Sequence, residues 1–408
     1  MSWRLAPVLA LLLPIGSGCD EKPKPLPAAS TKPAPSAAPK PSAKPLPSAK
    51  SAETEEPDAA ARVLGDAGVL GDLNDVGPAA PATASERGVV LITKDDRVVL
   101  APLAKKGGAL DPVKEPAAAF TLARGPAVAG AHAYWVSKGR LVRRAIAGGP
   151  LEDLSAHART STRVSAVAAT SEHPAAAAFI GDPAQSDGGL VARLWVEGAA
   201  PMVLTPEGSA ASTVSLVDTG DELIALSLEG RTGMTPVHAR RITFDDKTPK
   251  LEEDVVVWVG GPAQPLTEIA GGTTGMGDVW ALLPMERDIT HFGLAQIHVG
   301  ADPKMGAPVT WRAFPNGLDP APLATAKACG ETQAIYARPS EARPHAPQEL
   351  HLTEIGTDGL GPAAVIARGS AFANVSVAAI PGGTLVSYVA DFRTWARVVR
   401  CSSTATKK

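Results

Sequence analysis

Short apolar runs, each followed by a polar turn and an alternating run, recur along this chain. The clearest copy is AYWVSKGRLVRRAIAGG at residues 133–149. Its apolar run, residues 133–136, leads into a Ser-Lys-Gly turn, and residues 141–146 form the second run. Alternation with period two is typical of a half-buried strand, and two such runs joined by a Gly-containing turn are typical of a hairpin. The pattern therefore predicts a β-hairpin.

The same hairpin pattern occurs seven times from residue 88 onward. Its first runs centre near Leu91, Tyr134, Ala178, Ile224, Ala281, Ile335 and Val386, at separations of 43 to 57 residues. A period of about 40 to 50 residues with several strands per unit is the signature of propeller blades. We therefore expect an all-β protein with a single seven-bladed β-propeller, six or eight blades being possible. Two β-sandwich domains are the other arrangement that such strands permit.

The unit at residues 133–149 resembles the YWTD-type repeats of bacterial propellers. It carries a Tyr134-Trp135 pair, then a turn, then a strand led by Arg140. The resemblance implies the propeller fold and implies no ligand-binding residues.

The first and last units are expected to meet at a seam. The first unit lacks a predicted inner strand before Gly88, and the last ends soon after Arg400, so each would complete the other and remove an open sheet edge. Cys329 and Cys401 lie in the last two units. In an exported protein this pair predicts a disulfide that pins the closing blade. Two separate buried thiols are the alternative.

The turns between the two runs of each unit should lie on one face, because strands within a blade are antiparallel. The turns of the fourth to sixth units are the longest, and long loops on a rigid scaffold commonly carry binding residues. Gathered round a central opening, they would form a mixed-charge rim for a polar ligand or a protein partner. Hairpin turns are also charged for solubility alone, so both interpretations stay open. The candidate rim residues are Glu229, Arg231, His238, Glu286, Arg287, Asp288, His291, Arg338, Glu341, Arg343, His345 and Arg393.

Motifs for catalysis are scarce in this sequence. Gly-x-Ser-x-Gly, His-Glu-x-x-His and the Walker loop are absent. The eight histidines are not spaced like zinc ligands on one element, so we expect no metal and no cofactor. Glu229, Glu286 and Glu341, from different units, keep open a glycosidase-type carboxylate pair, which needs a separation of about 5 to 10 Å. Whether the protein is an enzyme is left uncertain, with a non-catalytic role favoured.

The N-terminal residues have the pattern of an export signal. Arg4 precedes an apolar stretch at residues 5–15, which is too short to span a bilayer but suits a signal peptide. Gly16-Ser17-Gly18 then stand directly before Cys19. This arrangement resembles the lipobox of bacterial lipoproteins, which implies cleavage after residue 18 and an acyl chain such as palmitate on Cys19.

A Pro-, Ala- and Lys-rich segment follows and offers too little apolar surface for a core, which is typical of a disordered tether. The expected organisation is a signal peptide at 1–18, a lipidated tether at 19–85, the propeller at 86–402 and a tail at 403–408. With 408 residues and a net charge of −3, the chain shows no basic footprint for nucleic acid.

The sequence therefore predicts a monomeric propeller lipoprotein of the bacterial cell envelope, facing the periplasm or the cell surface. It would be anchored in the bilayer through Cys19 and would act as a non-catalytic scaffold that binds a protein or a polar ligand through charged loops on one face. A propeller hydrolase or lyase acting on an envelope or extracellular glycan is the alternative.

Overall fold

Seven small antiparallel sheets make up the described part of the chain. The computed structural model describes residues 74–78, 81–103, 125–159, 163–183, 189–206, 209–230, 236–259, 268–274, 277–288, 291–299, 309–314, 323–341, 343, 346–357 and 359–401. Contacts divide the chain into Met1–Glu55 and Glu56–Lys408, and every described residue belongs to the second unit. Cys19 and the tether up to residue 73 lie outside the described residues. Among the described residues, no helix is long and apolar enough to cross a membrane.

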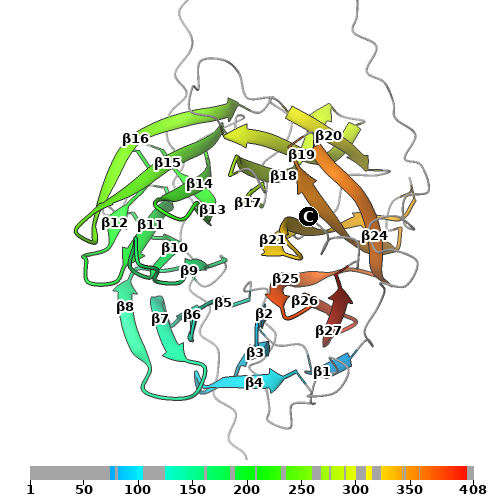
Figure 1. The fold of residues 1–408 in the computed structure, drawn as a ribbon, viewed down its shortest axis with the longest axis horizontal. Coiled ribbons are helices and arrows are strands. Elements are labelled where there is room, and N and C mark those ends of the chain that lie inside the picture. The colour runs from blue at the N-terminus through cyan, green and yellow to red at the C-terminus, as the bar shows by residue number, and fades with distance from the viewer. Residues whose placement is uncertain are drawn as a thin grey trace, which may run out of the picture. The chain divides into compact units, whose positions relative to one another are not determined.

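The sheets form the blades of a seven-bladed β-propeller, as predicted, and are numbered here in chain order (Figure 1). Blade 1 holds β2 (Ala82–Ser85), β3 (Gly88–Ile92) and β4 (Val98–Pro102), and blade 2 holds β5 (Ala127–Ala129), β6 (His132–Ser137), β7 (Arg140–Ala145) and β8 (Glu152–Ala156). Blade 3 holds β9 (Ser165–Val167), β10 (Ala176–Gly181), β11 (Val191–Val196) and β12 (Met202–Val203). Blade 4 holds β13 (Ala211–Asp218), β14 (Leu223–Glu229), β15 (Pro236–Asp245) and β16 (Thr248–Val259).

The remaining blades follow the same order from the inner strand outward. Blade 5 holds β17 (Ala270–Thr273), β18 (Val279–Asp288), β19 (His291–Val299) and β20 (Val309–Phe314). Blade 6 holds β21 (Leu323–Ala328), β22 (Glu331–Pro339), β23 (Gln348–Gly356) and β24 (Gly359–Gly369). Blade 7 holds β25 (Ala373–Ile380), β26 (Gly383–Ala390), β27 (Arg393–Arg400) and, as its outer strand, β1 (Asn74–Pro78).

The seven hairpins predicted from the sequence are the second and third strands of the blades. Each apolar run is a second strand (β3, β6, β10, β14, β18, β22 and β26), and its partner run is the third strand. The second strands are buried on both faces; β14 and β26, for example, are buried along their whole length. Strands covered on both sides show continuous apolar runs, which is why these segments gave the strongest signal in the sequence.

One apolar cluster lies between every two neighbouring blades. Its members come from adjacent sheets throughout: Phe179 and Trp195 of blade 3 pack with Tyr134 of blade 2, and Leu226 of blade 4 packs with Leu283 of blade 5. The seventh cluster joins blade 7 to blade 1 through Leu385 and other buried side chains. Each blade is therefore held by apolar contacts on both faces, and the series of contacts closes into a ring.

Inner strands of neighbouring blades are also linked by hydrogen bonds of one repeated kind. A serine hydroxyl on one inner strand accepts a hydrogen bond from a backbone N–H of the next. The pairs are Ser165 with Leu216, Ser215 with Gly271 and Ser376 with Ala84, at 2.9, 3.2 and 2.7 Å. The inner strands of blades 4 and 5 approach closely at this link. If Gly271 carried a Cβ atom, that atom would lie 2.1 Å from Cγ2 of Val217.

The seam is closed by the N-terminal strand. β1 pairs antiparallel with β27, with Asn74 opposite Ala396 and Pro78 opposite Arg393, and it becomes the outer strand of blade 7. The expectation that the first unit lacks an inner strand was wrong, because β2 fills that position. Its sequence, Ala-Thr-Ala-Ser, has no large apolar side chain to mark it. The sheets thus begin before residue 86.

A disulfide joins Cys329 to Cys401, as one of the two interpretations of the sequence predicted. Cys329 lies in the turn between β21 and β22, and Cys401 directly follows β27. The bond therefore ties blade 6 to the end of β27 in blade 7.

Removing this disulfide should destabilise the fold measurably. The double variant Cys329→Ala/Cys401→Ala should have a free energy of unfolding lower by about 4 kcal/mol, because a crosslink across 72 residues restricts the unfolded chain. Urea unfolding of the oxidised protein, the reduced protein and the double variant measures the difference. The reduced protein should match the variant, and equal stability of all three would contradict the prediction.

Candidate functional site

The turns between second and third strands lie at one end of the sheets, as the antiparallel order requires. Of the predicted rim residues, Arg231 and His345 lie outside the described residues. Glu286, Arg287 and Asp288 lie in β18, and His291 begins β19, but their side chains are not described. The rim as a whole therefore stays a prediction.

The other rim residues fall into separate groups. Glu341 and Arg343 pair with each other at 2.8 Å and are both largely exposed. Arg338 donates from Nε to Nε2 of His351 at 3.0 Å on blade 6, and His351 lies 3.2 Å from Glu349. Arg393 is exposed at the start of β27. The first two groups both belong to blade 6, and Arg393 belongs to blade 7.

Glu229 and His238 do come together, in a buried polar cluster on blade 4. Glu229 ends β14 and is only 1 % exposed, and its Oε1 accepts a 2.6 Å hydrogen bond from Ser227 Oγ. His238 Nδ1 lies 2.6 Å from Asp254 Oδ2 on β16 and 3.9 Å from Glu229 Oε2. Arg240 lies 3.7 Å from the other oxygen of Asp254. Both predicted residues are therefore buried between strands, not exposed on a rim.

Burial and charge act together on this cluster. Burial raises the pKa of Glu229, while Ser227 and His238 lower it less strongly. Burial lowers the pKa of His238, but the hydrogen bond to Asp254 and the charge of Glu229 outweigh it, so the pKa lies above its ordinary value of 6.5. Glu229 Oε2 and Arg240 Nε have no hydrogen-bond partner among the described residues. A buried carboxyl beside an imidazole is a pair of groups that general acid–base chemistry uses.

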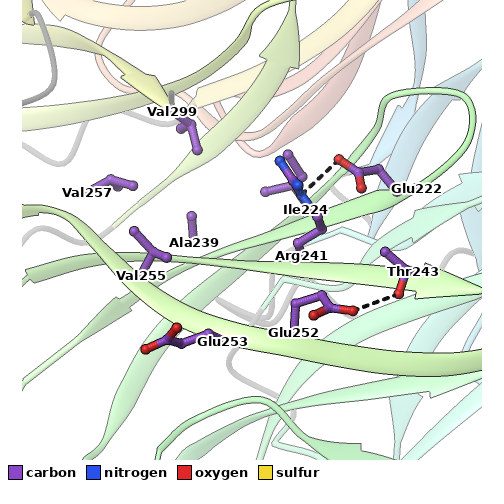
Figure 2. Close-up of a pocket in the computed structure, with 10 residues that line it drawn as sticks. All are labelled: Glu222, Ile224, Ala239, Arg241, Thr243, Glu252, Glu253, Val255, Val257 and Val299. Carbon is purple, nitrogen blue, oxygen red and sulfur yellow. Dashed lines mark hydrogen bonds and ion pairs between the residues drawn. The ribbon is translucent and has the colours of Figure 1, made fainter. Parts of the chain in front are cut away.

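A groove lies on the opposite face of blade 4, toward blade 5 (Figure 2). It measures about 400 Å³. Its floor is aliphatic and comes from three strands of blade 4 and one of blade 5, with Ile224, Ala239, Val255, Val257 and Val299 as the members. These side chains alternate along their strands with residues of the other face, so no single segment of sequence announces the groove.

Acidic side chains border the groove. Glu222 pairs with Arg241 at 3.0 Å, and Glu252 accepts a hydrogen bond from Thr243 at 3.1 Å (Figure 2). Burial raises the pKa of Glu222 more than Arg241 lowers it. Glu253 is exposed and has no ion-pair partner among the residues that the structure describes. The border therefore carries more negative than positive charge.

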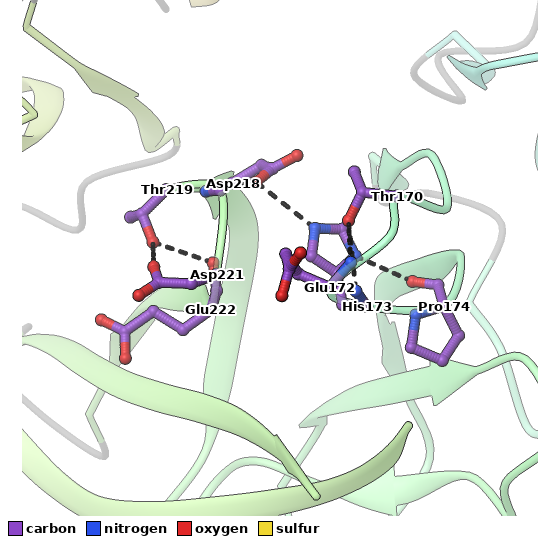
Figure 3. Close-up of polar contacts among 9 residues, drawn as sticks. Thr170, Glu172, His173, Pro174, Asp218, Thr219, Asp221 and Glu222 are labelled. Atoms are coloured by element: carbon purple, nitrogen blue, oxygen red, sulfur yellow. Dashed lines mark hydrogen bonds and ion pairs between the residues drawn. The ribbon is translucent and has the colours of Figure 1, made fainter. Parts of the chain in front are cut away.

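The acidic border continues into the turn between β13 and β14 (Figure 3). Asp218 accepts a hydrogen bond from Gly220 N at 2.8 Å, and Asp221 and Glu222 follow in the same turn. His173 of blade 3 is fully buried, donates from Nδ1 to the Pro174 carbonyl oxygen at 3.0 Å, and places Nε2 3.3 Å from Asp218. A carbonyl only accepts, so Nδ1 carries the proton. This histidine links the turns of blades 3 and 4.

The groove and this turn lie at the end of the sheets opposite to the predicted rim. Turns between first and second strands, and between third and fourth strands, meet there because neighbouring strands are antiparallel. Glu222 precedes β14, and Thr243 and Glu252 flank the turn between β15 and β16.

The central opening carries polar groups that sequence reasoning missed. Arg163, just before β9, donates to the carbonyl of Leu323, which begins β21. Glu268 Oε2 accepts from Leu323 N at 3.0 Å. Blades 3 and 6 are not neighbours, so the Arg163 contact crosses the opening. Both side chains line a cavity of about 30 Å³. Nothing in the sequence marks an Arg or a Glu directly before an inner strand as central.

Metal binding finds no support in the described part of the chain, where no group of three or more His, Cys, Asp or Glu side chains is placed to hold an ion.

Comparisons with known proteins assign no family to this chain. No family model matches the chain, and no curated protein matches it. A protein of unknown function from Dyadobacter fermentans is 12 % identical over 82 % of this chain and 98 % of its own, with a TM-score of 0.41. AofleA from Arthrobotrys oligospora is 10 % identical over 81 % and 86 %, with a TM-score of 0.41.

A puromycin-hydrolyzing peptidase from Mycobacterium tuberculosis is 12 % identical over 85 % of this chain but only 55 % of its own, with a TM-score of 0.43. Likeness at this level says nothing about what this chain binds or converts.

The His238 cluster predicts a pH-dependent stability. A folded-state pKa above the unfolded value gives stabilisation that is complete below about pH 6.5 and is lost as the pH rises through the folded value. Relative to Asp254→Asn, the native protein should be more stable by on the order of 1 kcal/mol on the acid side, and the difference should shrink above about pH 6.5. Urea unfolding at several pH values measures this.

Asp245→Asn, at the exposed end of β15, is the matched control and should show no such trend. A difference between native and Asp254→Asn protein that stays constant with pH would contradict the pairing.

Proposed function

We propose that this protein is a non-catalytic binding module of the bacterial cell envelope, and that the groove on blade 4 binds a segment of a partner protein. The groove with its aliphatic floor and acidic border carries the proposal. Ligand sites in proteins combine an apolar lining with a few placed polar groups, and this groove has both. A lipid on Cys19 would hold the module at the membrane, facing the periplasm or the cell surface.

The chemistry of the groove defines its occupant. Ile224, Val255 and Val257 offer contact to aliphatic side chains. Glu222 and Glu252 already pair with Arg241 and with Lys250, whereas Glu253 is exposed on β16. The remaining negative charge favours lysine and arginine, and complementary charge speeds association and selects the partner. The occupant is therefore a peptide segment in which aliphatic and basic side chains alternate.

Enzymatic hydrolysis or cleavage of a glycan is the second candidate. The buried Glu229 carboxyl, whose pKa is raised by burial, lies 3.9 Å from His238 and favours it, because a carboxyl beside an imidazole can serve general acid–base catalysis. The sequence predicted Glu286 or Glu341 as the second carboxylate beside Glu229. Glu341 is exposed and paired with Arg343.

Charge reversal at the groove tests the binding function. The variant Glu252→Lys/Glu253→Lys should bind an alternating Leu/Lys peptide about tenfold more weakly than the native chain, because two favourable charges become repulsive. Fluorescence anisotropy with labelled Leu/Lys and Leu/Glu peptides measures this, and the Leu/Glu peptide should bind the native chain poorly.

The matched control is Glu86→Lys/Glu341→Lys, which reverses two exposed acids on other blades. The groove is rejected if this control loses the peptide while the groove variant keeps it, and the predicted rim with Glu341 then becomes the binding face. Equal affinity of the native chain for the Leu/Lys and the Leu/Glu peptides would also reject the groove as the binding site.

Membrane anchoring has its own test. Replacing Cys19 by Ser should move the protein from the membrane fraction to the soluble fraction of cells, since the acyl chain needs the thiol. Mass spectrometry of the native protein should find the acyl chain on Cys19. An unmodified Cys19 in the native protein would contradict the anchor and leave the groove test unaffected.

A further inference from the structure

The acidic border of the groove on blade 4 is shaped by an irregularity in β16. Where β15 has one residue, Arg241, the facing stretch of β16 has two, Glu252 and Glu253. Such a β-bulge re-aims side chains, and both glutamates line the groove (Figure 2). Glu253 is followed on the same strand by Val255 and Val257 of the groove floor. A basic side chain next to an aliphatic one would therefore meet its complement along β16.

The tether contains two short segments with this combination of side chains. Residues 22–50 hold six lysines and no Asp or Glu. Leu26 and Leu46 are the only large aliphatic or aromatic residues of 22–60. Each belongs to the sequence Lys-Pro-Leu-Pro, at 24–27 and at 44–47, which lies outside the described residues. The few large apolar side chains of the tether are thus placed beside basic ones.

Proline prepares these segments for binding. A residue that precedes proline is restricted to extended conformations, and in Lys-Pro-Leu-Pro this applies to both the lysine and the leucine. A restricted segment loses less conformational entropy when it binds. In an extended chain, residues two apart are separated by about 6 to 7 Å, which is also the spacing of Glu253 and Val255 along a strand. The lysine and the leucine therefore match this acid and this valine in spacing.

The chain joins the propeller at the end of the sheets where the groove lies. β27 starts at Arg393, next to its turn with β26, and that turn belongs to the end of the predicted rim. β1 is antiparallel to β27, with Pro78 opposite Arg393 and Asn74 further along, opposite Ala396. The chain ahead of Asn74 therefore enters from the other end, which is the end of the groove.

Length permits either segment to reach the groove. Pro47 and Asn74 are separated by 26 residues. Fully extended, such a stretch spans about 85 Å, whereas a folded unit of about 330 residues is about 50 Å across. A segment that is joined covalently to its site has an effective concentration of about 1 mM. Even a weak contact is therefore populated.

We propose that the Lys-Pro-Leu-Pro segments of the tether occupy the groove on blade 4 while no partner is bound there. The leucine lies over Val255 on the aliphatic floor. The lysine lies beside Glu253, which has no ion-pair partner among the residues that the structure describes. The segment at 44–47 is the nearer one in sequence, and the segment at 24–27 can take its place.

This occupancy changes what a partner must do. A partner has to displace the tether, so the groove selects segments that bind more tightly than Lys-Pro-Leu-Pro does. The inference rests on the proposed function, because it concerns the same groove and the same chemistry.

Competition with the labelled Leu/Lys peptide tests the contact in the full chain. The variant Leu26→Ser/Leu46→Ser removes the apolar part of both segments. It should bind the peptide about threefold more tightly than the native chain, because the groove is no longer partly filled. The matched control is Ala29→Ser/Ala38→Ser, which adds two serines to the tether outside these segments and should leave the affinity unchanged.

Carbodiimide crosslinking, which joins a lysine directly to a carboxylate, gives a second measurement. Mass spectrometry of the native chain should find a lysine of either segment joined to Glu252 or Glu253. The yield should be independent of protein concentration, as expected within one chain. The leucine variant should lose this crosslink, and the serine control should keep it.

The outcomes separate this inference from the proposed function. Equal affinity of the peptide for the native chain and the leucine variant, or absence of the crosslink, would overturn the tether contact and leave the proposed function intact. A yield that rises with protein concentration would also overturn it, since the lysine would then come from a second chain. A peptide that binds neither chain would reject the groove itself, and with it both proposals.

Discussion

Apolar contact between neighbouring blades is the interaction on which the rest of this structure depends. No blade could bury its two faces alone, and each becomes covered only when a blade stands on either side. Seven clusters, one for every pair of neighbours, meet this need. The last of them exists only because the chain returns to its own beginning, so closure of the ring is part of the core and not an addition to it.

Sequence pattern was informative where a strand is covered on both sides. β14 and β26, with unbroken burial, stand out as apolar runs, and their third-strand partners alternate. The inner strands gave little signal. β2, β5 and β9 are three or four residues of Ala, Ser, Thr and Val, so no large apolar side chain marks them in the sequence. The count of blades could be predicted, and the start of the propeller could not.

Candidate site residues were harder to predict than the fold, for a related reason. Glu229 and His238 were assigned to a turn because they are polar and flank one, yet β14 runs to Glu229 and β15 includes His238. Their partner Asp254 lies on β16, and only the strand register brings it within 2.6 Å. The groove is a similar case, since Ile224, Val257 and Val299 come from three strands. Contacts made across strands leave no local trace in the sequence.

The groove on blade 4 and the acidic turn lie at one end of the sheets, whereas the turns richest in charge in the sequence lie at the other. Exposed pairs such as Glu341 with Arg343 neutralise each other at that second end. Charge density along the chain is therefore a poor guide to where charge is left unbalanced. Glu253, at the border of the groove, has no cation beside it among the described residues.

Closure by β1 also determines how this molecule responds to mechanical force. Any pull on the chain ahead of Asn74 reaches the propeller first at the pairing of β1 with β27. β27 ends at Arg400, and the next residue is bonded covalently to Cys329 in blade 6. The disulfide therefore fixes the end of β27 to blade 6, whereas β1 itself is held to β27 by strand pairing, so force on β1 loads that pairing against a strand anchored to two blades.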